Sequence, residues 1–226
     1  DSFGRFDQYM YPYYKKSVEE DKEITREQAL ELLECFFVKT AEWTQLYDYN
    51  SASVQVAFPI TQNLLIGGQT KEGTDACNEV TMLCLEAEEQ VGLIQPEIAM
   101  RIWKGTPAKY LRKAAEVVRL GRGKPKFYGD SKAIEMMHHA YPDMSLEDLR
   151  DYAVIGCVEI SMPHITQQHS ASGIFNIGKI LDLTLHNGKC SMCGTQLGPE
   201  TGDPRNFKTM DEFLEAYRKQ NDYFMD

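Results

Sequence analysis

The chain has 226 residues, of which 42% are hydrophobic, and this is enough to bury the core of an ordinary globular protein. Its net charge of −10 argues against a nucleic-acid partner, which would require a basic face. No apolar run is long enough to cross a bilayer, so no membrane contact is expected.

The start of the chain carries no targeting signal. Residues Asp1 to Arg5 lack the charged and then apolar pattern of a secretory leader. Six cysteines without such a leader favour a reducing cytoplasm over a disulfide framework. Because the sequence does not begin with Met, we expect a processed or truncated piece of a longer protein.

The first half of the chain is predicted to alternate between helices and a strand. Gly4–Tyr14 is rich in aromatic residues, and Pro12 argues against a regular helix there. A capping box of Thr25 and Gln28 begins a helix over Thr25–Thr40. The elements predicted next are a buried strand, ended by two glycines, and two helices, over Ala57–Leu65, Thr74–Val91 and Pro107–Leu120.

The second half continues in the same way. A helix over Ser145–Tyr152 leads into the β-branched run Ala153–Ile160, which reads as a buried strand that passes into a loop at Gly156. Two more helices are predicted over Ile174–His186 and Thr209–Gln220. Helices that alternate with short buried strands indicate an α/β fold, with too few strands to close a barrel.

The pair most suggestive of chemistry is Cys157 and Glu159. In extended backbone the side chains of residues two apart point to the same side, so the thiol and the carboxylate would project together from a buried turn. A carboxylate at the end of an apolar strand is costly to bury and often marks a tuned acid or base. A structural cysteine beside a glutamate bound to nearby amides fits the spacing equally.

Two further features leave alternatives open. Cys190 and Cys193 form a CxxC, which suits half a zinc site, a redox pair or two ordinary loop thiols. No second pair of ligands with matching spacing follows, so no metal site is predicted. His169 lies in a polar stretch, where a histidine serves equally as a proton donor, as an anion-binding group or as a surface residue.

Six motifs in a fixed order make the chain resemble a known family. They are Gly4–Tyr14 (GRFDQYMYPYY), Gln62–Gly68 (QNLLIGG), Gln95–Pro107 with its QP, Arg101 and GTP, Gly123–Asp130 (GKPKFYGD), Gly156–Glu159 (GCVE) and Gln196–Arg205 (QLGPETGDPR). The sequence resembles the glycyl radical enzymes. The resemblance lies with the branch of glycerol and diol dehydratases, choline lyase, isethionate lyase, hydroxyproline dehydratase and arylacetate decarboxylases.

The resemblance implies a ten-stranded barrel with the cysteine loop buried at its centre. Residues 1–226 would be the central part of a single larger catalytic domain. The family's radical glycine lies in an RVxGY-type motif that this sequence lacks. The glycine loop and the N-terminal part of the barrel would then lie outside the chain, and the piece would be inactive by itself.

The resemblance also implies a mechanism and partners. A separate activating enzyme, using S-adenosylmethionine and an iron–sulfur cluster, would install the glycyl radical. Cys157 would become the thiyl radical that takes a substrate hydrogen atom, and Glu159 would act as acid or base. The reaction would cleave a C–O, C–N, C–S or C–C bond of a small polar or anionic substrate. We expect a homodimer in the cytoplasm of an anaerobic bacterium.

Departures from the family pattern narrow the substrate. Pyruvate formate-lyase has two adjacent cysteines, whereas Gly156 precedes Cys157 here, so an acyl transferase is the lesser alternative. The diol dehydratases carry an acid after the cysteine, but none lies between Glu159 and Asp182. Gln168 or His169 would instead bind a carboxylate or sulfonate. By resemblance, Ser2 and Phe58 also fall near the substrate pocket.

Three other classes of protein remain open. The chain could be an inactive structural module, a zinc-binding module that uses Cys190 and Cys193, or a cysteine hydrolase with Cys157 as its nucleophile.

Overall fold

The computed structural model describes residues 2–42, 48–49, 61–163, 165 and 175–225. The chain divides into two compact units, residues 1–170 and 171–226, and each is considered by itself. Within the described residues no helix has the length and apolar character that crossing a membrane requires.

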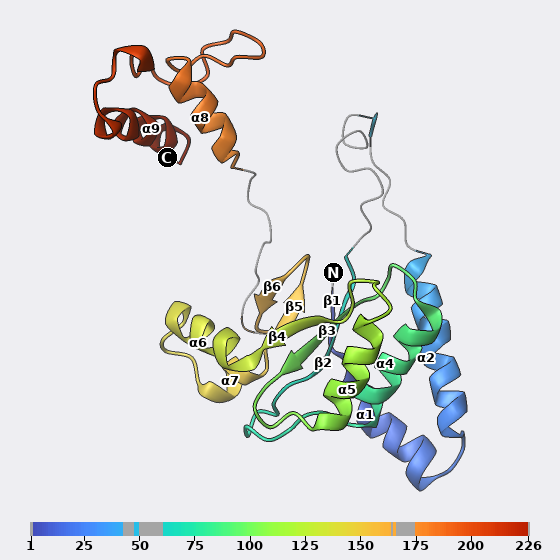
Figure 1. Ribbon diagram of the computed structural model, residues 1–226. Coiled ribbons are helices and arrows are strands. Elements are labelled where there is room, and N and C mark those ends of the chain that lie inside the picture. The colour runs from blue at the N-terminus through green and yellow to red at the C-terminus, as the bar shows by residue number, and fades with distance from the viewer. Residues whose placement is uncertain (1, 43–47, 50–60, 164, 166–174, 226) are drawn as a thin grey trace. The chain divides into compact units, whose positions relative to one another are not determined.

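The first unit is built on a parallel sheet with strand order β1-β2-β3-β4 (Figure 1). The strands are β1 (Ser2–Arg5), β2 (Asn63–Gly67), β3 (Glu97–Ile102) and β4 (Lys126–Gly129). Helices connect these strands, as parallel pairing requires, so the α/β prediction is confirmed. The described residues contain these four strands and a two-stranded hairpin, so the ten-stranded barrel stays a prediction about a longer protein.

The sheet buries a different core on each face because side chains alternate along a strand. Leu64 and Ile66 of β2, with Ile98 and Met100 of β3, pack into the larger cluster beneath the helices. Leu65 of β2 and Ala99 of β3 pack into a second cluster on the other face, with Met137, Leu149 and Val154 among its members. All of β2 is buried, since both of its faces are covered.

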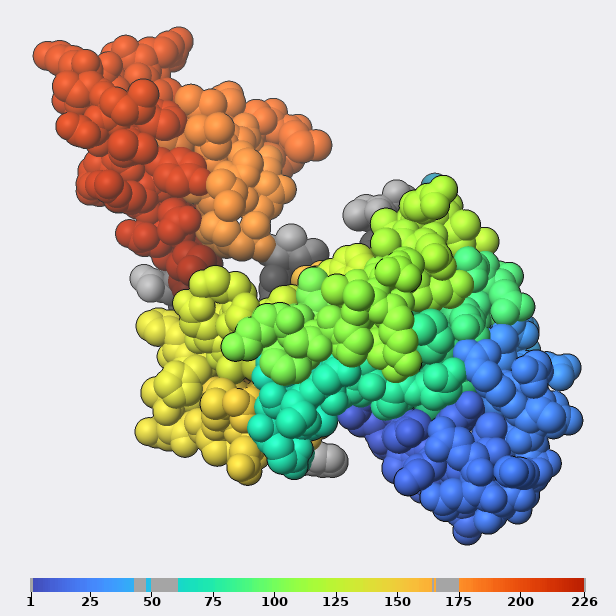
Figure 2. All heavy atoms as spheres, turned by 60° about the horizontal axis from the view of Figure 1, so that its bottom comes forward, coloured from blue at the N-terminus to red at the C-terminus, as the bar shows by residue number. Residues whose placement is uncertain are grey.

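The helices of this unit cover both faces. They are α1 (Phe6–Tyr14), α2 (Arg26–Ala41), α4 (Glu79–Val91), α5 (Ala108–Val118), α6 (Asp130–Ala140) and α7 (Leu146–Arg150), with a π-helical turn over Lys15–Glu20. The predicted capping box of Thr25 and Gln28 is present at the start of α2. In Figure 2 the green atoms around α4 lie directly against the blue atoms of α1 and α2, in agreement with the contacts among these helices.

Several sequence predictions for this unit need correction. Gly4–Tyr14 contains a regular helix, and Pro12 lies inside it. The packing of this helix stabilises it by more than the missing Pro12 amide hydrogen bond destabilises it. The Phe6 ring, for example, stacks on Phe36 at a centroid distance of 5.4 Å. Strands β1, β3 and β4 were not predicted, since they are short and have no clear alternation. The strand predicted from residue 57 begins at Asn63, and residues 57–60 lie outside the described part.

The run predicted as one strand over Ala153–Ile160 is an antiparallel hairpin. It consists of β5 (Ala153–Ile155) and β6 (Glu159–Ser161), with Ile155 opposite Glu159. Gly156 adopts φ = 57°, a left-handed conformation that glycine tolerates best, and this lets the chain reverse within three residues. Cys157 therefore lies within the turn and Glu159 begins the return strand, so the two residues do not alternate along one strand.

The hairpin is attached to the sheet by a fully buried polar cluster. The Arg101 guanidinium forms two hydrogen bonds with the Asp130 carboxylate, at 2.8 and 3.0 Å, and both side chains are 0% exposed. The Tyr152 hydroxyl donates to the same carboxylate at 2.9 Å, and Arg101 donates to the Tyr152 carbonyl oxygen at 3.1 Å. The residue that precedes β5 is thereby tied to β3 and to the start of α6.

The second unit contains α8 (Ile177–Leu185), a short 3₁₀ turn (Pro204–Asn206) and α9 (Met210–Met225). Both helices were predicted, with ends that differ by a few residues. The buried Gln220 of α9 donates to the Pro199 carbonyl oxygen at 2.6 Å and to the Thr201 hydroxyl at 3.0 Å. The loop between the helices is thereby tied to α9.

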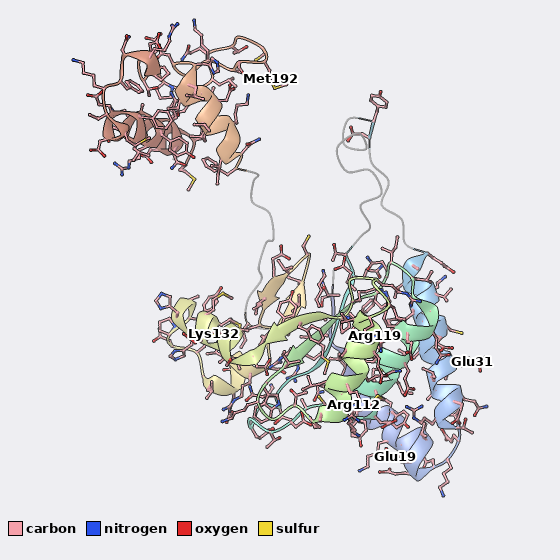
Figure 3. All side chains as sticks on the ribbon, in the orientation of Figure 1. Glu19, Glu31, Arg112, Arg119, Lys132 and Met192 are labelled. Atoms are coloured by element: carbon pink, nitrogen blue, oxygen red, sulfur yellow. The ribbon has the colours of Figure 1, made fainter. Side chains whose placement is uncertain are left out.

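Replacing Asp130 with Ala should weaken the attachment of the hairpin. The change leaves the Arg101 charge buried without its partner, which costs about 3–5 kcal/mol. Peptides that span β3, α6 and β5 should then exchange their amide hydrogens faster in the full-length protein. Lys132→Ala is the matched control, because Lys132 lies on the exposed surface of the same helix (Figure 3) and its pair with Glu135 contributes little. Equal protection in the two variants would contradict this role of Asp130.

Candidate functional site

The candidate site lies at the amino-terminal edge of the parallel sheet. Ser2, Asn63, Glu97 and Lys126 are each the first residue of a strand. Asn63 is in register with both Ser2 and Glu97. Lys126 is in register with Ala99, two residues after Glu97 and therefore on the same face of β3. Because parallel strands start at the same edge, four polar residues from distant parts of the sequence gather on one face of that edge.

The turn of the β5–β6 hairpin is held at this edge by its main chain. The Asn63 side-chain amide donates to the carbonyl oxygen of Gly156. The Lys126 ammonium donates to the carbonyl oxygen of Cys157 at 2.8 Å and also forms an ion pair with Glu97. Two consecutive carbonyl groups are therefore fixed from two strands of the sheet. We refer to Asn63, Glu97 and Lys126 as the turn clamp.

Cys157 lies at the tip of the turn and its side chain is exposed. Burial of the cysteine loop was expected at the centre of a ten-stranded barrel, and the described residues contain only part of such a barrel. That burial therefore stays a prediction about the longer protein. A thiol at an exposed tip with a fixed backbone is accessible to a partner segment or to a substrate.

Glu159 begins the return strand and is half-buried. Its carboxylate oxygen Oε2 accepts a hydrogen bond from the Val158 amide at 3.0 Å. The carboxylate thus caps the turn that carries Cys157, which is the contact anticipated for a structural glutamate. Such a contact also fixes the orientation of an acid or base.

Tyr128 is a candidate that the sequence analysis did not single out. Its hydroxyl is buried on the same face of β4 as Lys126, and it makes no hydrogen bond within the described part of the chain. Burial raises the pKa of Tyr128, and the negative charges of Glu159 and Glu97 raise it further. The buried Asn63 Oδ1 likewise has no hydrogen-bond partner among the described residues. Two polar atoms beside the turn therefore have unused hydrogen-bonding capacity.

Ser2 connects the sheet edge to a neighbouring cavity. Its hydroxyl accepts from the Gly4 amide at 2.9 Å and donates to the Asn63 carbonyl oxygen at 3.4 Å. It also lines a cavity of about 510 Å³ between β1, α1 and the hairpin, to which Arg5 and Ile155 contribute. Ser2 is thus joined to the clamp through Asn63.

The other predicted substrate residues cannot be placed. Phe58, Gln168 and His169 lie outside the described residues. The described residues also hold no cluster of three or more His, Cys, Asp or Glu side chains suited to a metal ion. The sequence analysis missed Asn63, Lys126 and Tyr128 as site residues, although two of the quoted motifs contain them. Only the register of the parallel strands brings them together.

Comparison with known proteins gives a consistent result. A family model described as "Pyruvate formate lyase-like" matches residues 1–226. An isethionate sulfite-lyase from Oleidesulfovibrio alaskensis is 38% identical over 226 residues, covering 99% of this chain and 27% of the relative. The chain therefore spans about a quarter of the length of such relatives.

Two solved structures share the fold. The glycerol-bound B12-independent glycerol dehydratase from Clostridium butyricum superposes with a TM-score of 0.88 at 41% identity, covering 99% of this chain and 27% of that one. A glycyl radical enzyme from Archaeoglobus fulgidus superposes with a TM-score of 0.87 at 32% identity, covering 97% and 28%.

Replacing Lys126 with Met should loosen the Cys157 turn. The change removes one of the two hydrogen bonds to the turn carbonyls, and a hydrogen bond to a charged group contributes about 1.5–3 kcal/mol. Peptides covering residues 153–161 of the full-length protein should exchange faster, and Lys126→Arg should restore part of the protection. Unchanged exchange in Lys126→Met would show that the clamp does not hold the turn.

Proposed function

The chain belongs to the pyruvate formate lyase-like family, and from that membership we propose that it is part of a glycyl radical lyase whose thiyl radical forms on Cys157. The observation that supports the proposal is the geometry of the Gly156–Glu159 turn. Its main chain is held at two consecutive carbonyl groups, and Cys157 lies at its tip. The relatives with a solved structure or a known reaction include glycyl radical enzymes and lyases.

Cys157 suits the role because its thiol stands at the tip of a turn whose backbone is fixed. A glycyl radical carried elsewhere in the full-length protein, installed by an activating enzyme with S-adenosylmethionine and an iron–sulfur cluster, supplies the initial removal of the thiol hydrogen atom. The Cys157 sulfur then takes a hydrogen atom from a substrate carbon and forms an S–H bond. When the product radical takes that hydrogen atom back, the sulfur radical is restored. The clamp keeps the sulfur in place through these transfers.

Glu159 is the proposed acid or base. Its carboxylate is fixed by the Val158 amide, two residues from the sulfur. From this position it accepts a proton from a substrate hydroxyl, or returns one to a leaving group, while the neighbouring bond breaks. Tyr128 is positioned to assist, because its unpartnered hydroxyl lies on the same face of the sheet and is affected by the charge of Glu159.

The proposed substrate is a small polar or anionic molecule that loses a C–O, C–N, C–S or C–C bond. The isethionate sulfite-lyase and the glycerol dehydratase act on molecules of this size. Gly156 precedes Cys157, where an acyl transferase of this family has a second cysteine, and this favours a lyase. Ser2, Phe58, Gln168 and His169 remain the proposed substrate contacts. A homodimer and an enclosing barrel are proposed for the full-length protein.

Cys157→Ser should separate radical formation from turnover. The full-length wild-type protein and the full-length variant are each incubated anaerobically with a cognate activating enzyme and S-adenosylmethionine. The glycyl doublet should appear in the electron paramagnetic resonance spectra of both. Turnover should be lost only in Cys157→Ser, because serine cannot relay the hydrogen atom. Cys35→Ser, at an exposed helical cysteine, is the control. Turnover retained without Cys157 would exclude this role. Absence of the radical in both proteins would favour an inactive structural module.

Glu159→Gln should lower turnover by about 10²–10⁴-fold, the usual contribution of a positioned acid or base. Glutamine keeps an oxygen that accepts from the Val158 amide, so the turn should keep its structure. The glycyl radical yield and the hydrogen exchange of residues 153–161 should match those of the wild-type protein. A loss of activity that is accompanied by faster exchange would instead assign Glu159 a structural role.

A further inference from the structure

The second unit contains two cysteines that the proposed function does not use. Cys190 and Cys193 lie in the loop after α8, on either side of Met192, which Figure 3 labels. The Gly194 amide donates to the Cys190 carbonyl oxygen at 2.8 Å, and the Cys190 amide donates to Thr195 at 2.9 Å. The loop is therefore a tight turn with one thiol at each end.

The surroundings of the Cys190 sulfur favour a thiolate. The Lys179 ammonium donates to this sulfur at 3.2 Å, and Asp182 fixes the ammonium at 2.8 Å. The backbone amides of Cys193 and Met192 also stabilise a negative charge on the sulfur, as does the Cys193 thiol. Together with Lys179, these hydrogen bonds lower the pKa of Cys190 to about 7. About half of the Cys190 side chains would then be ionised at neutral pH.

Lys179 also argues against a metal ion at this pair. A cation bound by the two sulfurs would meet the Lys179 ammonium at the same thiolate, at short range and with the same sign of charge. The described residues also provide no cluster of three or more His, Cys, Asp or Glu ligands. The same contacts stabilise an anionic nucleophile, which needs a nearby positive charge and an electrophile.

An electrophile can reach the sulfur from a surface cavity. Cys190 is only 6% exposed, but it lines a cavity of about 710 Å³ together with Ser191, Gly194 and Arg205. Cys193 is exposed at the other end of the turn. The thiolate is thus approached from the cavity, and the second thiol contacts it from the turn.

The geometry points to Cys190 and Cys193 as a thiol–disulfide exchange site for small-molecule disulfides, with Cys190 as the attacking thiolate and Cys193 as the resolving thiol. Cys190 attacks one sulfur of the external disulfide, a mixed disulfide forms, and one external thiolate leaves. Cys193 loses its proton and attacks the Cys190 sulfur, which forms the Cys190–Cys193 bond and expels the second external thiolate. The protein dithiol loses two electrons and the external disulfide gains them.

Peptide mapping of the full-length protein reads this reaction directly. The reduced protein is exposed anaerobically to oxidised glutathione, blocked with an alkylating reagent and digested with trypsin. The peptide Cys190–Arg205 contains both thiols and no other cysteine, while Cys157 and the exposed Cys35 fall in separate peptides. We expect the mass of the Cys190–Arg205 peptide to fall by that of two hydrogen atoms, with no glutathione attached, because the two cysteines form a disulfide within the peptide. Cys193→Ser should instead retain one glutathione on Cys190.

The dependence on Lys179 distinguishes this site from a merely accessible thiol. At pH 7 about one half of the Cys190 thiol is ionised, compared with a few per cent of an ordinary cysteine thiol. A thiolate of lower pKa is intrinsically less nucleophilic, which offsets part of this advantage. Cys190 should therefore react about threefold faster than an ordinary thiol. In the Cys193→Ser background, where the reaction stops at the mixed disulfide, Lys179→Met should move the half-maximal pH of glutathione addition upward, and Lys179→Arg should move it back. Lys189→Met, next to Cys190 but exposed, is the matched control, and its addition is read on the longer tryptic peptide Ile180–Arg205, which contains no further cysteine.

Three results would overturn the inference. They are a reduced Cys190–Arg205 peptide under conditions that modify Cys35, a half-maximal pH that does not change in Lys179→Met, and stoichiometric zinc that is released when Cys190 is blocked. The site is independent of the proposed lyase activity. Cys190→Ser should leave turnover intact, so failure of one proposal does not decide the other.

Discussion

The buried ion pair between Arg101 and Asp130 is the interaction on which the first unit depends. Burying two charges is costly, and the pair persists because every polar atom of the carboxylate has a partner, from Arg101, Tyr152 and Gln69. The pair joins β3, the start of α6 and the residue before β5. If it were absent, the start of the hairpin would lose its connection to β3 and α6. Only the turn clamp and side-chain packing would then hold the hairpin, and the position of the cysteine turn would be less well defined.

A second constraint is the parallel register of the sheet. Parallel strands begin at the same edge, so polar residues at strand starts are brought together without any contact between their neighbours in sequence. The clamp of Asn63, Glu97 and Lys126 is a consequence of this geometry. Beyond this edge the sheet buries apolar residues on both faces. One sheet thus provides two cores and, at its edge, a polar holder for the turn.

The sequence predicted the helices better than the strands. The cap of Thr25 and the periodicity of the helices are local signals, and α2, α4, α5, α8 and α9 lie close to their predicted ranges. Short parallel strands such as β3 have no local alternation, so nothing within the segment distinguishes them. The hairpin was missed because Gly156 was interpreted as the end of one strand, whereas its left-handed backbone reverses the chain.

The candidate site was predictable in its chemistry but not in its surroundings. Cys157 and Glu159 were recognisable from the GCVE motif, whereas the roles of Lys126 and Tyr128 depend on contacts between segments about thirty residues apart in sequence. The exposure of Cys157 in this chain could not be inferred either, since accessibility is set by which segments surround the tip.

The turn clamp binds carbonyl groups of the main chain and no side chain of the turn. Every residue has such a carbonyl, so the clamp is indifferent to which amino acids occupy the tip. The scaffold can therefore accept a different reactive group there without being rebuilt. In this respect the site separates its parts: the side chain at residue 157 supplies the chemistry, and the sheet edge supplies the hold on the main chain.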